Sequence, residues 1–411
     1  MTKIGGMAPQ RRDVLKMAGS LALLGAGMNR AFAQGSPVKI GVLNDQNGPY
    51  SDQAGPGSVV AVKMAVEDFG PTVLGRPIQI VVGDHQNKAD IGVAIAREWL
   101  GPGDVSMITD FANSSIALGV RELLGPNKKI GLFTGVSTTE LIGKSCTPYG
   151  SLWGHDTWAI SAGLVRAAMA KGAKTFYFIT ADYSFGHSLQ ADATGAAEAG
   201  GGKVVGTSLH PVNSNDFSSY LLAARSSKAD AVVLANGGAD LTNCLKQAAE
   251  FGLTKRQSVL TPLMFIVDVH SLGLEIAQGL TFTQSTYWDM NDETRAWAKR
   301  FFAQRGKMAS DSQVACYSAT LQYLKAVQRA GTLDADAVMK ELRATTISDV
   351  FTKNGKIRED GKMVYDRVLV RVKKPEESKY PWDYCEVLGM VPAAEAFRPL
   401  ALSKECSMVK L

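Results

Sequence analysis

Two kinds of hydrophobic pattern alternate along the chain. Runs of about four to eight apolar residues bounded by Gly, Pro or polar residues are typical of buried strands. Longer segments in which apolar residues recur every three or four positions are typical of helices with one buried face. The expected strands are residues 38–43, 77–82, 105–109, 129–134, 175–180, 203–208 and 231–234, and the expected helices are residues 55–69, 90–100, 114–124, 158–171, 185–199, 217–225 and 240–251.

This alternation of strand and helix with short connections predicts an α/β fold with parallel sheets covered by helices. The rhythm restarts after residue 171, which indicates two similar lobes. Three more helices are expected at residues 291–305, 314–330 and 335–342, followed by a strand at 363–372 and a Pro-bearing tail. Because these elements follow the second lobe, we expect the chain to pass between the lobes more than once.

The first 33 residues have the pattern of an export signal. The pair Arg11-Arg12 precedes an apolar run at residues 17–28, and the segment 31–33 (Ala-Phe-Ala) fits a signal-peptidase site. The apolar run is too short to span a bilayer, and the arginine pair resembles the twin-arginine export signal. We therefore expect cleavage after Ala33 and a mature protein in the periplasm. No Cys follows the cleavage site, so no lipid anchor is expected.

The charge of the chain changes once this segment is removed. The 411 residues carry a net charge of +5, and residues 1–33 hold five basic residues and one acidic residue, which leaves +1. A nearly neutral protein lacks the electrostatic attraction that nucleic acids or anionic membranes require. We expect neither as a partner, and no apolar stretch is long enough for a membrane span.

Five cysteines leave at least one unpaired. Cys244 and Cys316 lie in helical patterns and are expected to be small buried core residues. The other three lie in Pro-bearing or terminal segments, where a disulfide between Cys146 and Cys406 is the preferred prediction and Cys385–Cys406 the alternative. No CxxC occurs, so neither a redox motif nor a zinc site is expected.

The sequence contains none of the common catalytic or cofactor motifs. HExxH, GxSxG and a GxGxxG that opens a helix are absent. The five histidines, at positions 85, 155, 187, 210 and 270, show no metal-ligand spacing and are expected in loops or at the surface. We therefore expect no cofactor, no metal and no enzymatic activity, with an exported enzyme as an open alternative.

Four polar loops follow expected strands, at residues 44–50, 110–115, 134–139 and 180–186. Ligands of open α/β sheets bind beyond the carboxyl ends of strands, near helix N-termini. Hydroxyls and free N–H groups at such places suit a carboxylate. The alternative is that residues such as Ser114 and Thr139 only cap their own helices.

Residues 39–50 (Lys-Ile-Gly-Val-Leu-Asn-Asp-Gln-Asn-Gly-Pro-Tyr) resemble the first strand and loop of the substrate-binding proteins of ABC importers, in the branched-chain amino acid (Leu/Ile/Val) type. The resemblance continues at residues 181–186, 236–240 and 246–252 and covers essentially the whole mature chain. It implies a type I periplasmic binding fold of two doubly wound α/β lobes joined by three crossovers. Lobe one would be residues 37–157 with 290–352, and lobe two residues 158–289 with 353–411.

The resemblance also implies a function and a site. Such proteins close on a small ligand in the cleft and deliver it to an ABC permease, and we expect a monomer. In lobe one the ligand carboxylate would be held by Asn113, Ser114, the Val136 backbone and Thr138. The remaining implied ligand contacts are Tyr50 after the first strand, Tyr183, Phe185, Asn236 and Asp240 in lobe two, and Asp156, Tyr287 and Trp288 at crossovers.

One departure from the family bears on the ligand. Members that bind amino acids hold the ligand ammonium with an acidic residue shortly after the strand near residue 260, but residues 260–267 contain none. A buried ammonium without a counter-charge costs several kcal/mol. Met264 and Phe265 with the aromatic residues resemble instead the subgroup that binds aromatic carboxylates such as benzoate derivatives. Asp156 or Asp240 as a substitute acid leaves an amino acid or amide open, and a ligand sensor for a membrane receptor is the other alternative.

Overall fold

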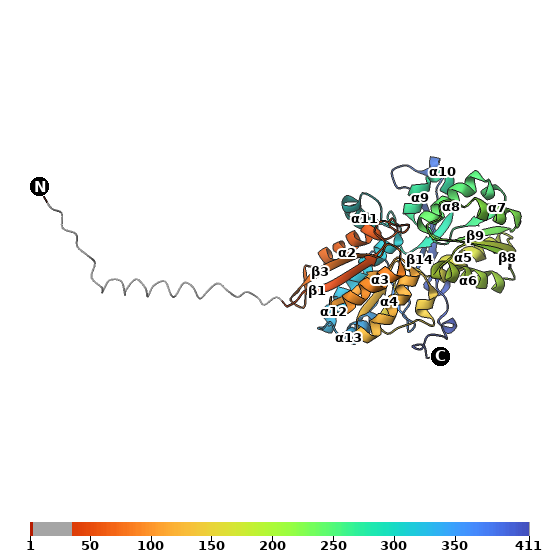
Figure 1. The fold of residues 1–411 in the computed structure, drawn as a ribbon. Helices are drawn as coiled ribbons and strands as arrows, with labels where there is room; N and C mark the ends of the chain where they lie inside the picture. Colours follow the sequence, from red (N-terminus) through yellow and green to blue (C-terminus); the bar gives the residue numbers. More distant parts are fainter. Residues whose placement is uncertain (3–34, 411) are drawn as a thin grey trace.

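The computed structural model describes residues 1–2 and 35–410, and its first strand begins at Val38 (Figure 1). The expected signal peptide and cleavage site, apart from residues 1–2, lie outside the described residues. Among the helices that the structure describes, none is both long and apolar enough to cross a membrane. Residues 38–410 form two lobes, the first built around one large sheet and the second around two smaller sheets.

The sheet of the first lobe has six strands in the order β2-β3-β1-β4-β5-β6. All neighbours are parallel except β2 and β3. Parallel neighbours need a crossover, and helices supply it: α2 packs with α12 on one face, and α3 with α4 on the other. The bounds are β1 (Val38–Asn44), α2 (Gly55–Phe69), β2 (Thr72–Val73), β3 (Arg76–Asp84), α3 (Ala89–Leu100), β4 (Val105–Asp110), α4 (Ser114–Asn127), β5 (Ile130–Phe133), β6 (Gly150–Leu152), α11 (Asp292–Arg305), α12 (Asp311–Ala330) and α13 (Ala335–Ala344).

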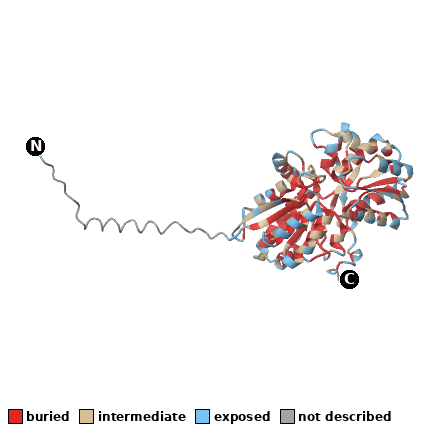
Figure 2. Cartoon of the chain, in the orientation of Figure 1, coloured by how far each residue is buried: buried red, intermediate tan, exposed pale blue. Residues whose placement is uncertain are grey.

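The second lobe holds a parallel sheet in the order β10-β9-β7-β8 and an antiparallel sheet in the order β11-β14-β15. Both sheets contribute to one hydrophobic core, and buried strands occupy the centre of each lobe (Figure 2). The antiparallel sheet was not expected from the sequence. The bounds are α5 (Thr157–Ala170), β7 (Thr175–Ala181), α6 (Ser184–Ala199), β8 (Lys203–His210), α7 (Ser218–Ser226), β9 (Ala231–Ala235), α8 (Gly238–Glu250), β10 (Ser258–Leu260), α9 (Ile266–Leu272), α10 (Leu274–Ala277), β11 (Thr281–Gln284), β14 (Arg367–Val372) and β15 (Cys385–Val391).

The third crossover lies later in the chain than the expected boundary at residue 352. The hairpin β12 (Lys356–Ile357) and β13 (Met363–Val364) packs into the core of the first lobe, together with Tyr365. The core of the second lobe resumes at Val368. The strand expected over residues 363–372 is therefore divided between two lobes, because the chain crosses between β13 and β14.

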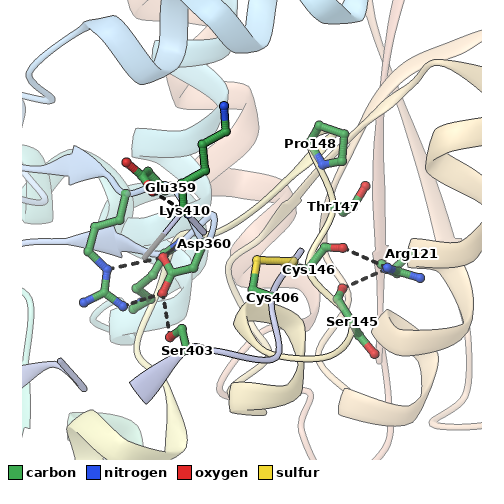
Figure 3. Close-up of a disulfide and its surroundings, with 12 residues drawn as sticks. Arg121, Ser145, Cys146, Thr147, Pro148, Glu359, Asp360, Ser403, Cys406 and Lys410 are labelled. Atoms are coloured by element: carbon green, nitrogen blue, oxygen red, sulfur yellow. Dashed lines mark hydrogen bonds and ion pairs between the residues drawn. A yellow bond between two sulfur atoms is a disulfide. The ribbon is translucent and has the colours of Figure 1, made fainter. Parts of the chain in front are cut away.

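The C-terminal tail returns to the first lobe. After β15 and the short helix α14 (Ala393–Ala396), Phe397 enters the core of the first lobe. Cys406 then forms a disulfide with Cys146, with the two Cα atoms 5.5 Å apart (Figure 3). Cys385, the partner in the alternative pairing, is buried and free, as are Cys244 and Cys316. The tail is thus attached covalently to the lobe that contains β1.

Removal of the disulfide tests how much this attachment stabilises the fold. The bond closes a loop with a sequence separation of 260 residues, so its loss frees the unfolded chain. We expect the double variant Cys146→Ser/Cys406→Ser to lose about 2–4 kcal/mol of unfolding free energy, measured by urea denaturation. A reducing agent should lower the midpoint of the natural chain and leave that of the variant unchanged. Equal stability of the two oxidised proteins would contradict the prediction.

Candidate functional site

A cavity lies between the two lobes, beyond the carboxyl ends of their parallel strands. This is where open α/β sheets bind ligands. The walls of the cavity come from the loops after β1, β4, β5, β6, β7 and β10 and from the start of α12. The lining residues are Tyr50, Gln53, Ala54, Ala112, Asn113, Ser114, Gly135, Val136, Ser137, His155, Tyr183, Phe185, Leu263, Phe265 and Ser312.

The backbone between β4 and α4 is strained. Asp110, Phe111 and Ala112 have φ values of 79°, 76° and 44°, a left-handed conformation that costs non-glycine residues of order 1–3 kcal/mol each. Asn113 ends the strained segment by capping α4, since its side-chain oxygen accepts from the backbone N–H groups of Ser115 and Ile116. The strained segment leads directly into the N-terminus of α4, whose first residue, Ser114, lines the cavity.

Asp110, the first residue of this segment, is fully buried. Burial raises the pKa of its carboxyl group to about 7, although Asn44 donates a hydrogen bond of 2.7 Å to one of its oxygens. The other oxygen is so close to Gly135 that an added Cβ there would approach it to 2.1 Å. Glycine is therefore required at this point of the cavity wall.

Several donors at one end of the cavity are unengaged. No described residue accepts a hydrogen bond from the backbone N–H of Ser114 or Val136, or from the hydroxyls of Ser114 and Ser137. Ser114 is the first residue of α4, where the helix dipole favours negative charge. Thr138 lies outside the lining, because its hydroxyl caps the short 3-10 helix Thr139–Ile142 by accepting from the Glu140 N–H. Free N–H and hydroxyl donors at a helix N-terminus are chemically suited to bind an anion.

Aromatic side chains form much of the remaining wall. The hydroxyls of Tyr50 in lobe one and Tyr183 in lobe two form a hydrogen bond of 2.6 Å across the cavity. Burial raises the pKa of both tyrosines, so both hydroxyls are neutral at ordinary pH. Phe185 packs against Tyr183 with a ring separation of 5.9 Å, and Phe265 lines the same wall. The wall suits an apolar or aromatic ligand body.

The lobes are in contact around this cavity. Ser115 and Ser184 pair their hydroxyls at 3.1 Å. The amide of Gln53 donates to both oxygens of Asp268 at 3.3 and 3.2 Å. Near Tyr50, the backbone N–H of Ala239 donates to the Pro49 carbonyl at 3.1 Å. The structure is therefore a closed arrangement of the lobes.

A buried charged cluster lies behind the cavity, where the chain crosses between the lobes. Nδ1 of His155 lies 3.5 Å from an Asp311 oxygen, and the Arg367 guanidinium lies 3.9 Å from the same oxygen. Burial acts to raise the pKa of Asp311, but His155 and Arg367 outweigh it and hold that pKa below its usual value. Burial lowers the pKa of His155. Asp311 is thus ionised at neutral pH although it is buried.

Six of the residues expected at the ligand site lie outside the lining: Thr138, Asp156, Asn236, Asp240, Tyr287 and Trp288. Asp156 caps α5 through the Ala159 N–H and lies 3.6 Å from the buried Lys362 ammonium. The carboxyl group of Asp240 accepts from the backbone N–H groups of Asn213 and Ser214 and so fixes a loop.

Asn236, Tyr287 and Trp288 make contacts within lobe two. Asn236 donates to His210 at 3.2 Å in the buried interior. Tyr287 and Trp288 both donate to the Trp382 carbonyl, at 3.3 and 3.1 Å. These two aromatic residues hold the loop before β15 instead of facing the cavity. The remaining expected residues, Tyr50, Asn113, Ser114, Val136, Tyr183, Phe185 and Phe265, do line it.

Sequence reasoning missed five lining side chains of chemical interest: Gln53, Ser137, His155, Leu263 and Ser312. Ser137 and His155 are direct neighbours of the expected Thr138 and Asp156, so the loops were identified but not the residue that faces inward. Ser312 reaches the cavity only because α12 packs on α2. Of the five histidines, His85 and His155 lie in loops and His187 and His270 are exposed, as expected, whereas His210 is the buried last residue of β8.

No cluster of three or more His, Cys, Asp or Glu among the described residues is placed to hold a metal ion.

A family model described as periplasmic binding protein matches residues 37–378 of the chain. The chain belongs to the periplasmic binding protein family.

Solved structures of this family resemble the protein closely. A periplasmic binding protein from Burkholderia mallei is 45% identical, with a TM-score of 0.89 over 91% of this chain and 99% of its own. A branched chain amino acid ABC transporter periplasmic ligand-binding protein from Burkholderia xenovorans is 41% identical, with a TM-score of 0.80 over 90% and 99% of the two chains. The predicted fold class, two α/β lobes of the type I periplasmic binding protein, is confirmed.

More distant relatives are similar over less of the sequence or in fold alone. The chain is 25% identical to Leu/Ile/Val-binding protein homolog 6 of Brucella abortus over 52% of this chain and 54% of that protein, so it spans about half the length of the curated relatives it matches. Two solved structures are 20% identical to this chain and cover 87% of it. One is a solute binding protein from Rhodopseudomonas palustris in complex with 3,4-dihydroxy benzoic acid, with a TM-score of 0.77 over 98% of its own chain. The other is a leucine binding protein from Thermotoga maritima, with a TM-score of 0.76 over 99% of its own chain.

Gly238 tests whether this periplasmic binding protein needs the close approach of its lobes. A Cβ at Gly238 would lie 2.3 Å from the Pro49 carbonyl oxygen of the other lobe. We expect Gly238→Ala to hold the lobes apart, measured as a larger radius of gyration by small-angle X-ray scattering. Gly252→Ala is the matched control, because Gly252 has a similar positive φ (65° against 60°) but no neighbouring atom within 4 Å. Both variants should lose about 1 kcal/mol of stability. Equal radii would contradict the prediction.

Proposed function

We propose that this periplasmic binding protein is the solute-binding component of an ABC importer, and that it captures a small carboxylate with an aromatic or hydrophobic body. The ligand would lie in the cavity between the lobes, and the closed protein would deliver it to the membrane permease. Membership of a family of transporter substrate-binding proteins supports the import role over an exported enzyme. We further propose that the protein works in the periplasm as a monomer.

The cavity contains donors for a carboxylate and no acid for an ammonium, and this observation carries the proposal. The free N–H groups of Ser114 and Val136 and the hydroxyls of Ser114 and Ser137 supply the donors. No Asp or Glu is among the lining residues. Asp156 and Asp240, the two acids that the sequence left as substitutes, are engaged elsewhere. A buried ammonium would lack the counter-charge that it needs.

An amino acid ligand is the second candidate, and Asp268 is the observation in its favour. This residue follows directly after the acid-free stretch 260–267, and its partner Gln53 lines the cavity. Its carboxyl group, however, caps α9 through the Phe265 N–H, and burial raises its pKa to about 7. A carboxyl group held in this way is a poor partner for an ammonium. The aromatic acid therefore fits the cavity better.

Thermal unfolding with a panel of ligands tests the proposal. The panel contains benzoates, phenylacetates, cinnamates, branched-chain and aromatic amino acids, dicarboxylates and amides. A ligand at 100 times its dissociation constant adds about 2.7 kcal/mol of stability, which is readily seen as a rise in Tm. We expect aromatic carboxylates to raise Tm and their amides to have no effect. A rise with amino acids alone would contradict the aromatic acid and favour the second candidate.

Variants of Ser114 and Thr138 test which of these two hydroxyl groups contacts the ligand carboxylate. Ser114→Ala removes one hydroxyl donor from the cavity, so we expect about tenfold weaker binding of the aromatic acid by isothermal titration calorimetry. The cap at Asn113 is retained, so Tm of the free protein should change little. Thr138→Val is the matched control: it removes a cap outside the cavity, and affinity should stay within about twofold. Weaker binding by Thr138→Val with unchanged binding by Ser114→Ala would contradict the prediction and indicate that Thr138 contacts the ligand.

A further inference from the structure

His155 lines the cavity, yet its side chain is almost completely buried, with 1% of the residue exposed. It lies in the first crossover, after β6, and its ring packs 5.3 Å from the ring of Phe265 in lobe two. Nδ1 faces Asp311 at 3.5 Å. Neither ring nitrogen makes a hydrogen bond with a described residue. Nδ1 is completely enclosed by protein, whereas Nε2 retains some exposed surface. Because His155 is a lining residue of the cavity, we infer that the exposed surface of Nε2 faces the cavity.

The surroundings of His155 fix the orientation of its ring. Asp311 is itself held by the backbone N–H of Ser285 at 2.7 Å and by the hydroxyl of the same serine. The positive charges that act on the ring are Arg367 and Lys362, and the anion beside it is Asp311. A fixed anion at Nδ1 favours a proton on that nitrogen, which leaves Nε2 as the atom available to a ligand.

We propose that His155 is a specificity-determining residue whose Nε2 takes a hydrogen bond from a second polar group on the bound carboxylate. The inference rests on the proposed function and adds to it the substrate class: an aromatic acid with a ring hydroxyl, as opposed to the unsubstituted acid. A buried polar atom left without a partner is costly, so an unsubstituted ring against Nε2 would bind less tightly. Gln53 and Ser312 border the same cavity and add polar character to it.

Two features separate this site from the carboxylate cradle. The cradle donates through N–H and hydroxyl groups at the start of α4 and after β5, whereas His155 comes from the crossover after β6. With a proton on Nδ1, Nε2 is an acceptor, and an acceptor repels a carboxylate but accepts from a phenol. The two ends of the ligand are thereby distinguished by opposite hydrogen-bonding roles.

Isothermal titration calorimetry with benzoate, 3-hydroxybenzoate and 4-hydroxybenzoate tests the inference. We expect the natural protein to bind one of the hydroxy acids about tenfold more tightly than benzoate. His155→Asn keeps a donor for Asp311 near the position of Nδ1 and removes Nε2. It should weaken binding of the hydroxy acid more than binding of benzoate, and so abolish the preference. His155→Gln, whose longer amide reaches toward the position of Nε2, should keep part of the preference.

The outcomes distinguish the inference from the proposed function. If the natural protein binds benzoate and the hydroxy acids equally, the role of His155 is overturned while the aromatic carboxylate stands. If the preference is present and survives in His155→Asn, the role is also overturned. If none of the three acids binds, the aromatic ligand falls and the inference falls with it. Thermal unfolding of the ligand-free variants checks whether each variant is folded. If His155→Asn is not folded, His155→Gln is used for the test.

Discussion

The carboxylate of Asp311 is the point on which the two-lobed arrangement depends. It lies at the start of α12 and faces one residue from each crossover: His155 from the first, Ser285 from the second and Arg367 from the third. A buried carboxylate is stable only when its neighbours compensate its charge and lone pairs. The three crossovers must therefore converge on it, and this convergence defines where the lobes meet and which loops face one another.

The fold was largely predictable because its signals are local. The helix expected over residues 55–69 coincides with α2, and the strands at 38–43 and 175–180 lie within β1 and β7. Each depends on apolar periodicity within a short window. The antiparallel sheet of β11, β14 and β15 escaped prediction because a long stretch of chain separates β11 from β14, and because β15 lies in the segment interpreted as a Pro-bearing tail. The position of the third crossover also escaped, because β13 and β14 read as one apolar run in the sequence.

The candidate site was predictable only to the level of the loop. Residues 134–139 and the crossover near 156 were identified, but the side chains that face the cavity are Ser137 and His155 and not their neighbours Thr138 and Asp156. Which residue of a loop points inward depends on caps and turns that long-range packing decides. The role of Asp156 illustrates this, since its carboxyl group is committed to α5 and to Lys362, a residue more than 200 positions away.

The walls of the cavity divide its chemistry between the lobes. The polar groups Gln53, Asn113, Ser114, Ser137 and Ser312 belong to lobe one, whereas lobe two contributes Tyr183, Phe185, Leu263 and Phe265. If the proposed ligand docks first on lobe one, it meets the hydrogen-bonding partners of that lobe before the lobes close, so lobe one would govern the rate of association. The aromatic wall of lobe two would then exclude water and govern the rate of escape. Substitutions in the two lobes should therefore change the rate of association and the rate of escape separately.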